Sequence, residues 1–323
     1  MNHPIRLLSL LSCALLALQH NAVANDKKRR PANHPRAAIA APRQEPTPLL
    51  PDSPLHGWDY VIDKLRKDGF KEERLRHAYL DPRMPYLTLV PFSVHPRESS
   101  ASYRHFTKSA EVQLARDFLT KNKKAFDEAE KRFHVSRFVV VSILLIESHF
   151  GRHTGQLLAL HRLSRLASVA DPANLKQNFH EQQLRDRTVT YEQVVQRAAY
   201  LEKTFYPEIL SLFDIAEKAG VDVLDIRGSS AGAIGMPQFL PSAMIKFGID
   251  GDSDHRLSLY EDADAIASTS NFLHFYGWKE PADRNAKRRV IMRYNKSEAY
   301  VEAVLGVAAR LDGKLTASPR GKK

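Results

Sequence analysis

The sequence has almost no cysteine and no long apolar run. Its 323 residues include a single cysteine, Cys13, so the chain can form no internal disulfide and no zinc site that needs several cysteines. No stretch reaches about 18 consecutive apolar residues, which argues against an ordinary transmembrane helix. Hydrophobic residues make up 43% and charged residues 26% of the chain, and these ordinary values exclude a mainly disordered protein.

Acidic residues are too few to balance the basic ones. Lys and Arg together number 48 and Asp and Glu 37, which gives a formal net charge of +11. A basic surface suits nucleic acid, anionic lipid or an acidic polymer, and the charge alone does not choose among them.

The first residues narrow this choice. A basic start, the apolar stretch Leu7–Leu18 and the small-x-small site Ala22-Val23-Ala24 are typical of a signal peptide, which we predict over residues 1–24. One alternative is a buried N-terminal helix. Another is a lipobox ending at Cys13, which would make the protein an outer-membrane lipoprotein. Export argues against nucleic acid as a partner and favours the anionic polymers of a cell envelope.

Residues 25–54 are predicted to form a linker. Seven of these 30 residues are proline and none is glycine, so the segment cannot bury enough apolar surface to fold and stays extended. Its basic cluster, Lys27 to Arg30, is either a solvated tail or an electrostatic tether to a membrane or wall. Residues 313–323 form a similar basic tail, which we expect to be frayed.

The body of the chain, residues 55–312, is predicted to be helical. Its apolar residues are mostly three or four positions apart, and no alternating strand series appears. We therefore expect a mainly α fold, with a lysozyme-sized core and additional helical material around it. The expected helices are two short ones ending before Gly69 and Asp81, one or two over 112–133, and others over about 190–219, 261–277 and 297–312.

One acidic side chain ends an apolar run. Residues 138–146 are mostly apolar and follow Ser136, a good N-cap. A buried strand is one interpretation, but we expect a buried central helix that stops at Gly151. Glu147 would then be a carboxyl at the end of a buried helix, where desolvation raises its pKa and allows it to act as a general acid. The alternative is that Glu147 is the first solvent-facing residue after a core helix.

A glycine-rich segment covers residues 227–242. Three glycines in eight residues, followed by two prolines, predict a tight backbone with exposed amides that a substrate can approach closely. The segment also contains a Gly-x-Ser-x-Gly pattern around Ser230, as in the nucleophile elbow of serine hydrolases. That motif needs a parallel sheet, which the rest of the chain does not suggest.

An acidic loop begins at residue 250. Its acidic residues match the spacing of a calcium loop, and they are Asp250, Asp252, Asp254 and, further along, Glu261 and Asp264. His255 stands at the sixth position, where glycine is usual. The alternative is an acid-rich surface turn.

Two tyrosines follow near the C-terminus, Tyr294 beside Asn295 and then Tyr300. They either cover the apolar faces of sugar rings in a cleft or pack in the core. His149 and His153 lie four positions apart with a glycine between them, and we expect no zinc site there.

Together these segments resemble the membrane-bound lytic murein transglycosylase B family, glycoside hydrolase family 103. The resemblance covers about residues 55–312 and depends on four motifs in the family's order. They are Ile146–Arg152, Gly228–Ser242, the acidic loop leading into Asp264–Leu273 and Gly277-Trp278, and Arg293–Tyr300.

The resemblance implies an enzyme that cleaves peptidoglycan glycan strands. The family breaks the β-1,4 bond between N-acetylmuramic acid (MurNAc) and N-acetylglucosamine (GlcNAc) without water and leaves a 1,6-anhydro ring. A single carboxylate, here Glu147, would act first as acid and then as base. The resemblance also implies a lysozyme-like fold, no required cofactor and a periplasmic monomer. Membrane association through the N-terminus is an alternative.

The resemblance assigns further residues by position. Ser229 and Gln238 match substrate-contacting residues, and Phe239 matches a wall of the site. The other matches are in the last motif, where Tyr294 and Asn295 would contact the sugar and orient the acid, and Tyr300 would be another cleft tyrosine.

The resemblance also suggests a structural calcium ion, which some members hold. Its ligands would be the carboxylates of Asp250, Asp252, Asp254 and Asp264 and the carbonyl of Arg256. The chain departs from the family's pattern at His255 and Arg256, which replace Gly and His, and at Phe150, which replaces a tryptophan.

Three other functions stay open from the sequence. They are a lysozyme-type hydrolase that leaves reducing ends, a non-catalytic cell-wall-binding protein, and a serine esterase at Ser230. The presence of Glu147 together with Ser229, Gln238 and Asn295 argues against the non-catalytic alternative.

Overall fold

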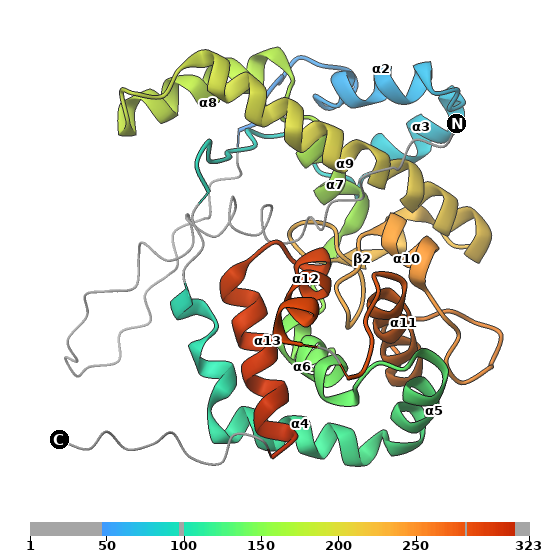
Figure 1. Cartoon of the computed structure of the whole chain (residues 1–323). Coiled ribbons are helices and arrows are strands. Elements are labelled where there is room, and N and C mark those ends of the chain that lie inside the picture. Colours follow the sequence, from blue (N-terminus) through green and yellow to red (C-terminus); the bar gives the residue numbers. More distant parts are fainter. Residues whose placement is uncertain (1–46, 97–99, 282, 314–323) are drawn as a thin grey trace, which may run out of the picture. The chain divides into compact units, whose positions relative to one another are not determined.

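The computed structural model describes residues 47–96, 100–281 and 283–313 (Figure 1). The predicted signal peptide, Cys13, most of the predicted linker and residues 314–323 lie outside these ranges. Within them, no helix is both long and apolar enough to span a membrane.

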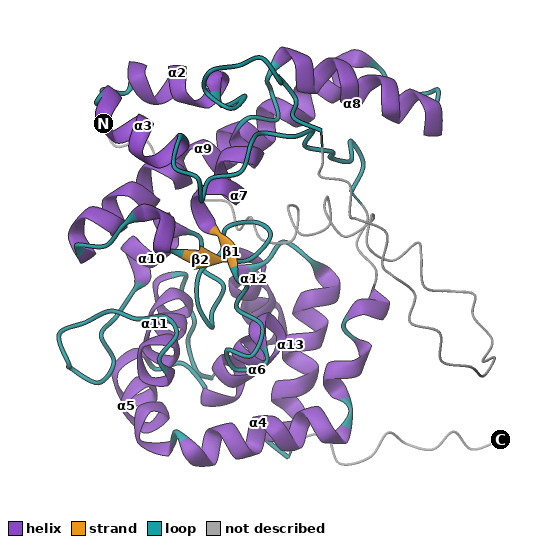
Figure 2. Cartoon of the chain, turned by 180° about the vertical axis from the view of Figure 1, so that it is seen from behind, coloured by secondary structure: helices purple, strands orange, loops and turns teal. Residues whose placement is uncertain are grey.

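The prediction of a mainly α fold is confirmed. The described residues form twelve α-helices, and their two strands are only two residues long each (Figure 2). The chain divides into two compact units, which we call the larger unit (described residues 100–163 and 206–313) and the smaller unit (47–96 and 164–205). The chain passes from one to the other within helix α7 (Ala159–Ala167) and again within α9 (Tyr191–Ala219).

The smaller unit contains α2 (Asp59–Lys67), α3 (Glu72–Tyr79) and α8 (Pro172–Arg185). The first two helices end before Gly69 and Asp81, as the sequence predicts. Helix α8 presents Asn174 and Asn178, one helical turn apart, to an extended segment of chain. Their side-chain carbonyls accept hydrogen bonds from the backbone N–H groups of Val90 (2.8 Å) and Phe92 (3.2 Å). The two asparagines thus satisfy backbone groups that have no neighbouring strand.

The folded chain begins earlier than residue 55. Pro48 and Thr88 form an isolated antiparallel bridge, and the backbone N–H of Leu49 donates to the carbonyl of Leu87 (2.7 Å). The predicted linker boundary at residue 54 is therefore corrected to no later than Pro48. The proline content of this short segment did not reveal that its backbone pairs with residues 87 and 88.

The larger unit is built around α6 (Arg137–Ser148). The segment is a helix and not a strand, and the Ser136 hydroxyl caps it by accepting the backbone N–H of Phe138 (3.3 Å). Its apolar residues are buried on nearly every side, and it packs mainly against α13 (Glu298–Leu311), with α4 (Ser109–Lys121) and α11 (Asp262–Phe275) as further neighbours.

The remaining helices complete this unit. Residues 112–133 lie in two helices, α4 and α5 (Lys123–Phe133), because the non-helical backbone of Asn122 separates them. Helices α10 (Pro241–Phe247) and α12 (Arg284–Tyr294) flank α11 in sequence.

The end of α6 differs slightly from the prediction. The helix stops at Ser148, and the next three residues, His149, Phe150 and Gly151, all have positive φ angles of 49°, 57° and 82°. This left-handed turn ends the helix one residue beyond Glu147. Two of its positions carry side chains that disfavour this conformation, so the surrounding packing must impose it.

A short antiparallel strand pair brings the glycine-rich segment close to the segment that follows α6. Strand β1 (Leu157–Leu158) pairs antiparallel with β2 (Arg227–Gly228). Gly155 has φ +86°, and a Cβ atom there would overlap the carbonyl of Gly228. Only glycine permits this close approach.

Candidate active site

Glu147 lies at the C-terminal end of α6, in the last turn of the buried helix. The residue is half-buried, and its Oε1 atom is shielded from solvent. Burial raises the pKa of Glu147 from its ordinary 4.5 to about 7, and the nearby Tyr300 hydroxyl acts in the opposite direction. The carboxyl can therefore be both protonated and ionised near neutral pH.

Three of the predicted site residues each have a buried polar atom without a regular hydrogen-bond partner in the described chain. Glu147 Oε1, the Tyr300 hydroxyl and Asn295 Oδ1 form no hydrogen bond of regular geometry with any described residue. Buried polar groups are usually paired, so the unpaired atoms of Glu147 and the nearby Tyr300 are typical of a site that binds something.

Tyr294 and Tyr300 are both buried close to Glu147. Burial raises their pKa values well above 10, and the charge of Glu147 adds to this effect. The two rings lie parallel with centroids 6.4 Å apart, and the Tyr294 hydroxyl donates to the carbonyl of Pro237 (2.6 Å). Both tyrosines are therefore core residues that form the inner side of the site.

Ser148 links Glu147 to the glycine-rich segment. Its buried hydroxyl donates to the carbonyl of Met236 (2.8 Å) and accepts the backbone N–H of Gly151 (2.9 Å). One side chain thus joins the end of α6, the left-handed turn after it and the loop at residue 236.

The glycine-rich segment is held mainly by its own residues. Ser229 is half-buried, and its hydroxyl accepts the backbone N–H groups of Ala231 (3.3 Å) and Ala233 (3.2 Å). Gln238 is buried with φ +53°, and its side-chain amide donates to the carbonyls of Thr154 (3.1 Å) and Gly235 (2.8 Å).

Phe239 is buried in an aromatic cluster. Its ring packs against those of Phe247, Phe272 and Tyr294, at centroid distances of 6.3, 5.8 and 5.8 Å. The residue therefore supports the site from within the core.

The serine-elbow interpretation lacks its structural context. In the described chain the only strand next to Ser230 is β2, which pairs antiparallel with β1, and no parallel sheet is present. The Ser230 carbonyl instead accepts a hydrogen bond from the Arg162 guanidinium (2.9 Å).

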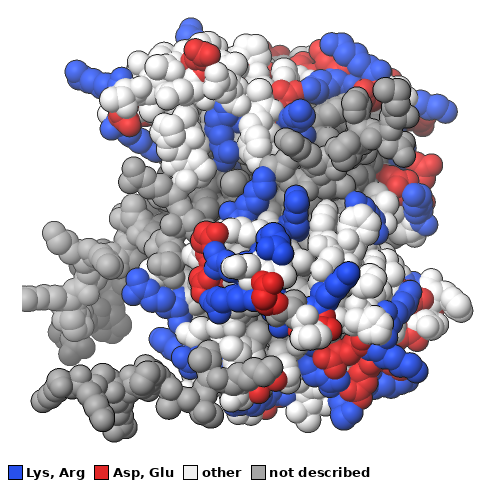
Figure 3. Space-filling model, in the orientation of Figure 1, with Lys and Arg blue, Asp and Glu red and all other residues white. Residues whose placement is uncertain are grey.

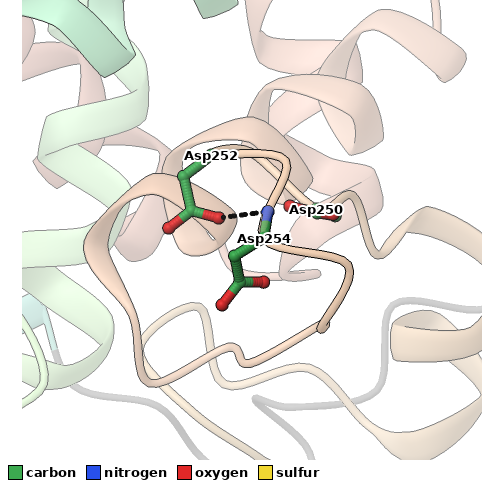
Figure 4. A group of neighbouring side chains, drawn as sticks. All are labelled: Asp250, Asp252 and Asp254. Carbon is green, nitrogen blue, oxygen red and sulfur yellow. Dashed lines mark hydrogen bonds between the residues drawn. The ribbon is translucent and has the colours of Figure 1, made fainter.

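The acidic loop brings three carboxylates together. Asp250, Asp252 and Asp254 each place an oxygen within 4.8 Å of the others (Figure 4). Backbone N–H groups of Ser253 and His255 donate hydrogen bonds to Asp250 and stabilise the loop. His255 has a φ of +69°, at the position where glycine is usual.

The other two predicted calcium ligands have different surroundings. Asp264 is buried, and its two oxygens accept the backbone N–H groups of Gly251 and Ser258, both at 2.7 Å. The backbone N–H of Arg256 donates to Asp254 (2.8 Å). Among the described residues, Asp264 is therefore not one of the three clustered carboxylates. It stabilises the loop through its two backbone hydrogen bonds.

Two structural supports of the site were missed by the sequence reasoning. Glu208 on α9 is buried and accepts both the backbone N–H (2.8 Å) and the hydroxyl (2.7 Å) of Ser242, which anchors the end of the glycine-rich segment. An acidic residue among the apolar residues of α9, between Phe205 and Ile209, could have predicted a buried carboxylate that needs a hydrogen-bond partner. His149 Nε2 lies 3.3 Å from Glu111 of α4, a contact with no signal in the sequence.

The fold and the site define a lysozyme-like helical domain with a half-buried carboxyl of raised pKa at the end of its central helix. The chain belongs to the family described as the transglycosylase SLT domain, whose model matches residues 56–288.

A protein of known activity is similar to this chain in sequence. The chain is 26% identical over 231 residues to membrane-bound lytic murein transglycosylase B of Escherichia coli (strain K12), a match that covers 67% of this chain and 56% of that protein. The chain therefore spans little more than half the length of this curated relative.

Two solved structures show the fold. The Escherichia coli lytic transglycosylase Slt35 in complex with calcium is 19% identical, with a TM-score of 0.60 over 83% of this chain and 96% of that one. SltB3 from Pseudomonas aeruginosa in complex with NAG-NAM-pentapeptide is 18% identical, with a TM-score of 0.56 over 79% of each chain.

Proposed function

We propose that this protein is a lytic transglycosylase that cleaves the MurNAc-β-1,4-GlcNAc bond of peptidoglycan and leaves 1,6-anhydro-MurNAc ends. The family membership and the relatives named as lytic transglycosylases support the class of reaction. The observation that carries the proposal is Glu147, a desolvated carboxyl with a pKa of about 7 at the end of the central helix.

Glu147 would carry out both proton transfers. Its protonated carboxyl donates to the glycosidic oxygen as the bond from that oxygen to C1 of MurNAc breaks, and GlcNAc leaves with a free hydroxyl. The resulting carboxylate takes the proton of the MurNAc C6 hydroxyl while O6 forms a bond to C1. The proton returns to Glu147, so the cycle balances without water. A pKa near the working pH suits one group that must serve in both states.

The other site residues divide into two groups in this proposal. Ser229, Gln238 and Asn295 are assigned to sugar contacts. Phe239, Tyr294 and Tyr300 shape the site from the core side, and the two tyrosines set the environment of the Glu147 carboxyl. SltB3, which binds NAG-NAM-pentapeptide, supports glycan strands as the substrate.

We also propose that the acidic loop binds calcium as a structural ion. The three convergent carboxylates are oxygen donors of the kind that calcium prefers, and Slt35 has been seen in complex with calcium. The ligands would be Asp250, Asp252 and Asp254. The ion would hold three like charges together, and no chemical step needs it.

The protein is proposed to act as an exported, periplasmic monomer. The predicted signal peptide over residues 1–24 and the net charge of +11 support this location, because a basic protein is attracted to an anionic wall. The relative in Escherichia coli is named as membrane-bound.

Mass spectrometry of the products distinguishes the candidate reactions. Purified sacculi are incubated with the protein or with its Glu147→Gln variant, and the soluble muropeptides are analysed. Products one water lighter than those of hydrolysis, absent with the variant, are the expected result. Reducing-end products would make the protein a lysozyme-type hydrolase. Sacculi that bind both proteins and release nothing would make it a wall-binding module.

A further inference from the structure

The first residue of the left-handed turn after α6 contacts an acid of α4. His149 Nε2 lies 3.3 Å from Glu111 Oε2, and the two side chains are 24% and 23% exposed. Figure 3 shows acidic side chains beside Lys and Arg on one face of the molecule, whereas the polar neighbour of Glu111 is an imidazole. Glu111 Oε2 is buried and forms no regular hydrogen bond with any described residue, so the imidazole compensates in part for the water that this oxygen has lost.

The second residue of the turn is held by the same helix. The ring of Phe150 lies parallel to that of Phe118 on α4, with centroids 4.1 Å apart and 9° between the planes. Glu111 and Phe118 are seven positions apart, so they lie on one face of α4. One face of α4 therefore contacts two consecutive residues of the turn.

The backbone conformation of His149 does not explain why a histidine stands there. Its φ of 49° and ψ of 50° are left-handed, a conformation that glycine or asparagine adopts more readily at a helix end. Helix α5 ends in the same way at His134, with φ 56° and ψ 35°. The His134 side chain is exposed and forms no hydrogen bond, ion pair or ring contact with any described residue. The two histidines thus share a conformation and differ in what their side chains contact.

The turn that α4 holds encloses Glu147. The backbone N–H of His149 donates to the carbonyl of Leu145 (2.9 Å). The backbone N–H of Phe150 donates to the carbonyl of Leu144 (3.2 Å). Glu147 lies between donor and acceptor in both hydrogen-bonded turns, so a displacement of His149 moves the backbone that carries the carboxyl.

We propose that His149, held by Glu111, is a positioning residue that fixes the direction of the Glu147 carboxyl. This inference rests on the proposed function, because it concerns the acid of that reaction. Burial lowers the pKa of His149 below its ordinary 6.5, so at neutral pH the uncharged imidazole offers Glu111 an Nε2–H group. A displacement of about 1 Å at a reacting group can cost about a hundredfold in rate, so a modest loosening of this turn is enough to slow proton transfer.

Two substitutions of His149 separate the side-chain contact from the backbone preference. The amide nitrogen of Gln can reach the position of Nε2, whereas that of Asn reaches only the position of Nδ1. On a soluble NAG-NAM oligosaccharide, His149→Asn should lower kcat about tenfold and change KM by less than about twofold, and His149→Gln should retain most of kcat. A role limited to ending the helix predicts the opposite order, because Asn adopts the left-handed conformation more readily.

His134 and Glu111 provide the matched controls. His134→Asn and His134→Gln change the same residue type in the same conformation at the end of α5 and should leave kcat unchanged. Glu111→Ala should lower kcat as much as His149→Asn does, and the double variant should lose no more than either single variant, since both changes remove one contact. The melting temperature of each variant verifies the fold.

The pKa of Glu147 tests the positioning without requiring cleavage. Carbon-13 NMR of glutamate carboxyls, with Glu147→Gln to assign the resonance, should give a pKa of about 7 in wild type and His149→Gln. The pKa in His149→Asn should lie closer to 4.5, because a displaced carboxyl regains water.

Three results would overturn the inference. They are a His149→Asn variant at least as active as His149→Gln, an equal loss of kcat in the His134 variants, and a pKa of Glu147 that His149→Asn leaves unchanged. If wild type fails to cleave sacculi but the pKa of Glu147 responds to His149 as expected, the proposed reaction fails and the positioning role stands.

Discussion

Replacing Glu147 by Gln should stabilise the protein at alkaline pH relative to wild type while it removes most of the cleavage activity. Gln keeps the shape of the side chain and cannot ionise. The pKa of Glu147 is about 7 in the folded protein and 4.5 in its ordinary state, so the folded protein binds this proton more tightly than the unfolded chain does. The corresponding stability is fully present below pH 4.5 and is lost as the pH rises through 7.

The magnitude follows from the size of the shift. A shift of this kind corresponds to about 3 kcal/mol of unfolding free energy. Urea unfolding followed by circular dichroism, at about pH 4 and about pH 8, should show that the variant gains about 3 kcal/mol on wild type between the two conditions. Cleavage of sacculi should fall by about a thousandfold, the typical effect of removing a general acid.

An exposed glutamate provides the control. Glu128 on α5 is solvent-accessible, and Glu128→Gln should show the same stability difference from wild type at both pH values, within a few tenths of a kcal/mol. If Glu147→Gln behaves like this control, the carboxyl is not desolvated in the folded protein and the argument for its acid role is refuted.

Three further predictions concern the surroundings of Glu147 and the acidic loop. Tyr300→Phe removes the hydroxyl that lowers the pKa of Glu147, so the alkaline limb of the pH–rate profile should move to higher pH; a shift to lower pH would contradict this electrostatic role. Ser148→Ala leaves the Met236 carbonyl and the Gly151 N–H without their partner and should cost about 1–3 kcal/mol in urea unfolding, whereas Ser148→Thr, which keeps the hydroxyl, should cost less; equal costs would exclude the hydrogen bonds as the cause. Calcium at ten times its Kd should stabilise the protein by about 1.4 kcal/mol, seen as a rise in melting temperature that Asp250→Asn abolishes and that magnesium does not reproduce; an unchanged melting temperature at millimolar calcium would remove the metal assignment.

Local patterns in the sequence predicted the central helix well. The N-cap at Ser136, the apolar run and the acid at its end are consecutive, so their consequences follow from helix geometry and desolvation alone. The pKa of Glu147 is raised as that reasoning requires.

Long-range contacts could not be predicted in the same way. Nothing in the spacing of Tyr294 and Tyr300 distinguishes an aromatic wall facing sugar from a ring packed in the core, and both rings are buried. Asp264 matches the acidic pattern of a metal loop, but its oxygens accept backbone N–H groups, a partner that a pattern of side chains does not reveal. The division into two units depends on which helices pack together, and amphipathic periodicity leaves this open.

The packing of α6 against α13 has a consequence for synthesis of the chain. Roughly 150 residues separate the end of α6 from the start of α13, which at ordinary translation rates is on the order of ten seconds. Both segments of the smaller unit are complete by residue 205, so that unit can fold first. The most apolar helix of the described chain therefore lacks its main packing partner until synthesis is nearly finished, and a nascent chain that stops before α13 exposes the face of α6 that α13 covers.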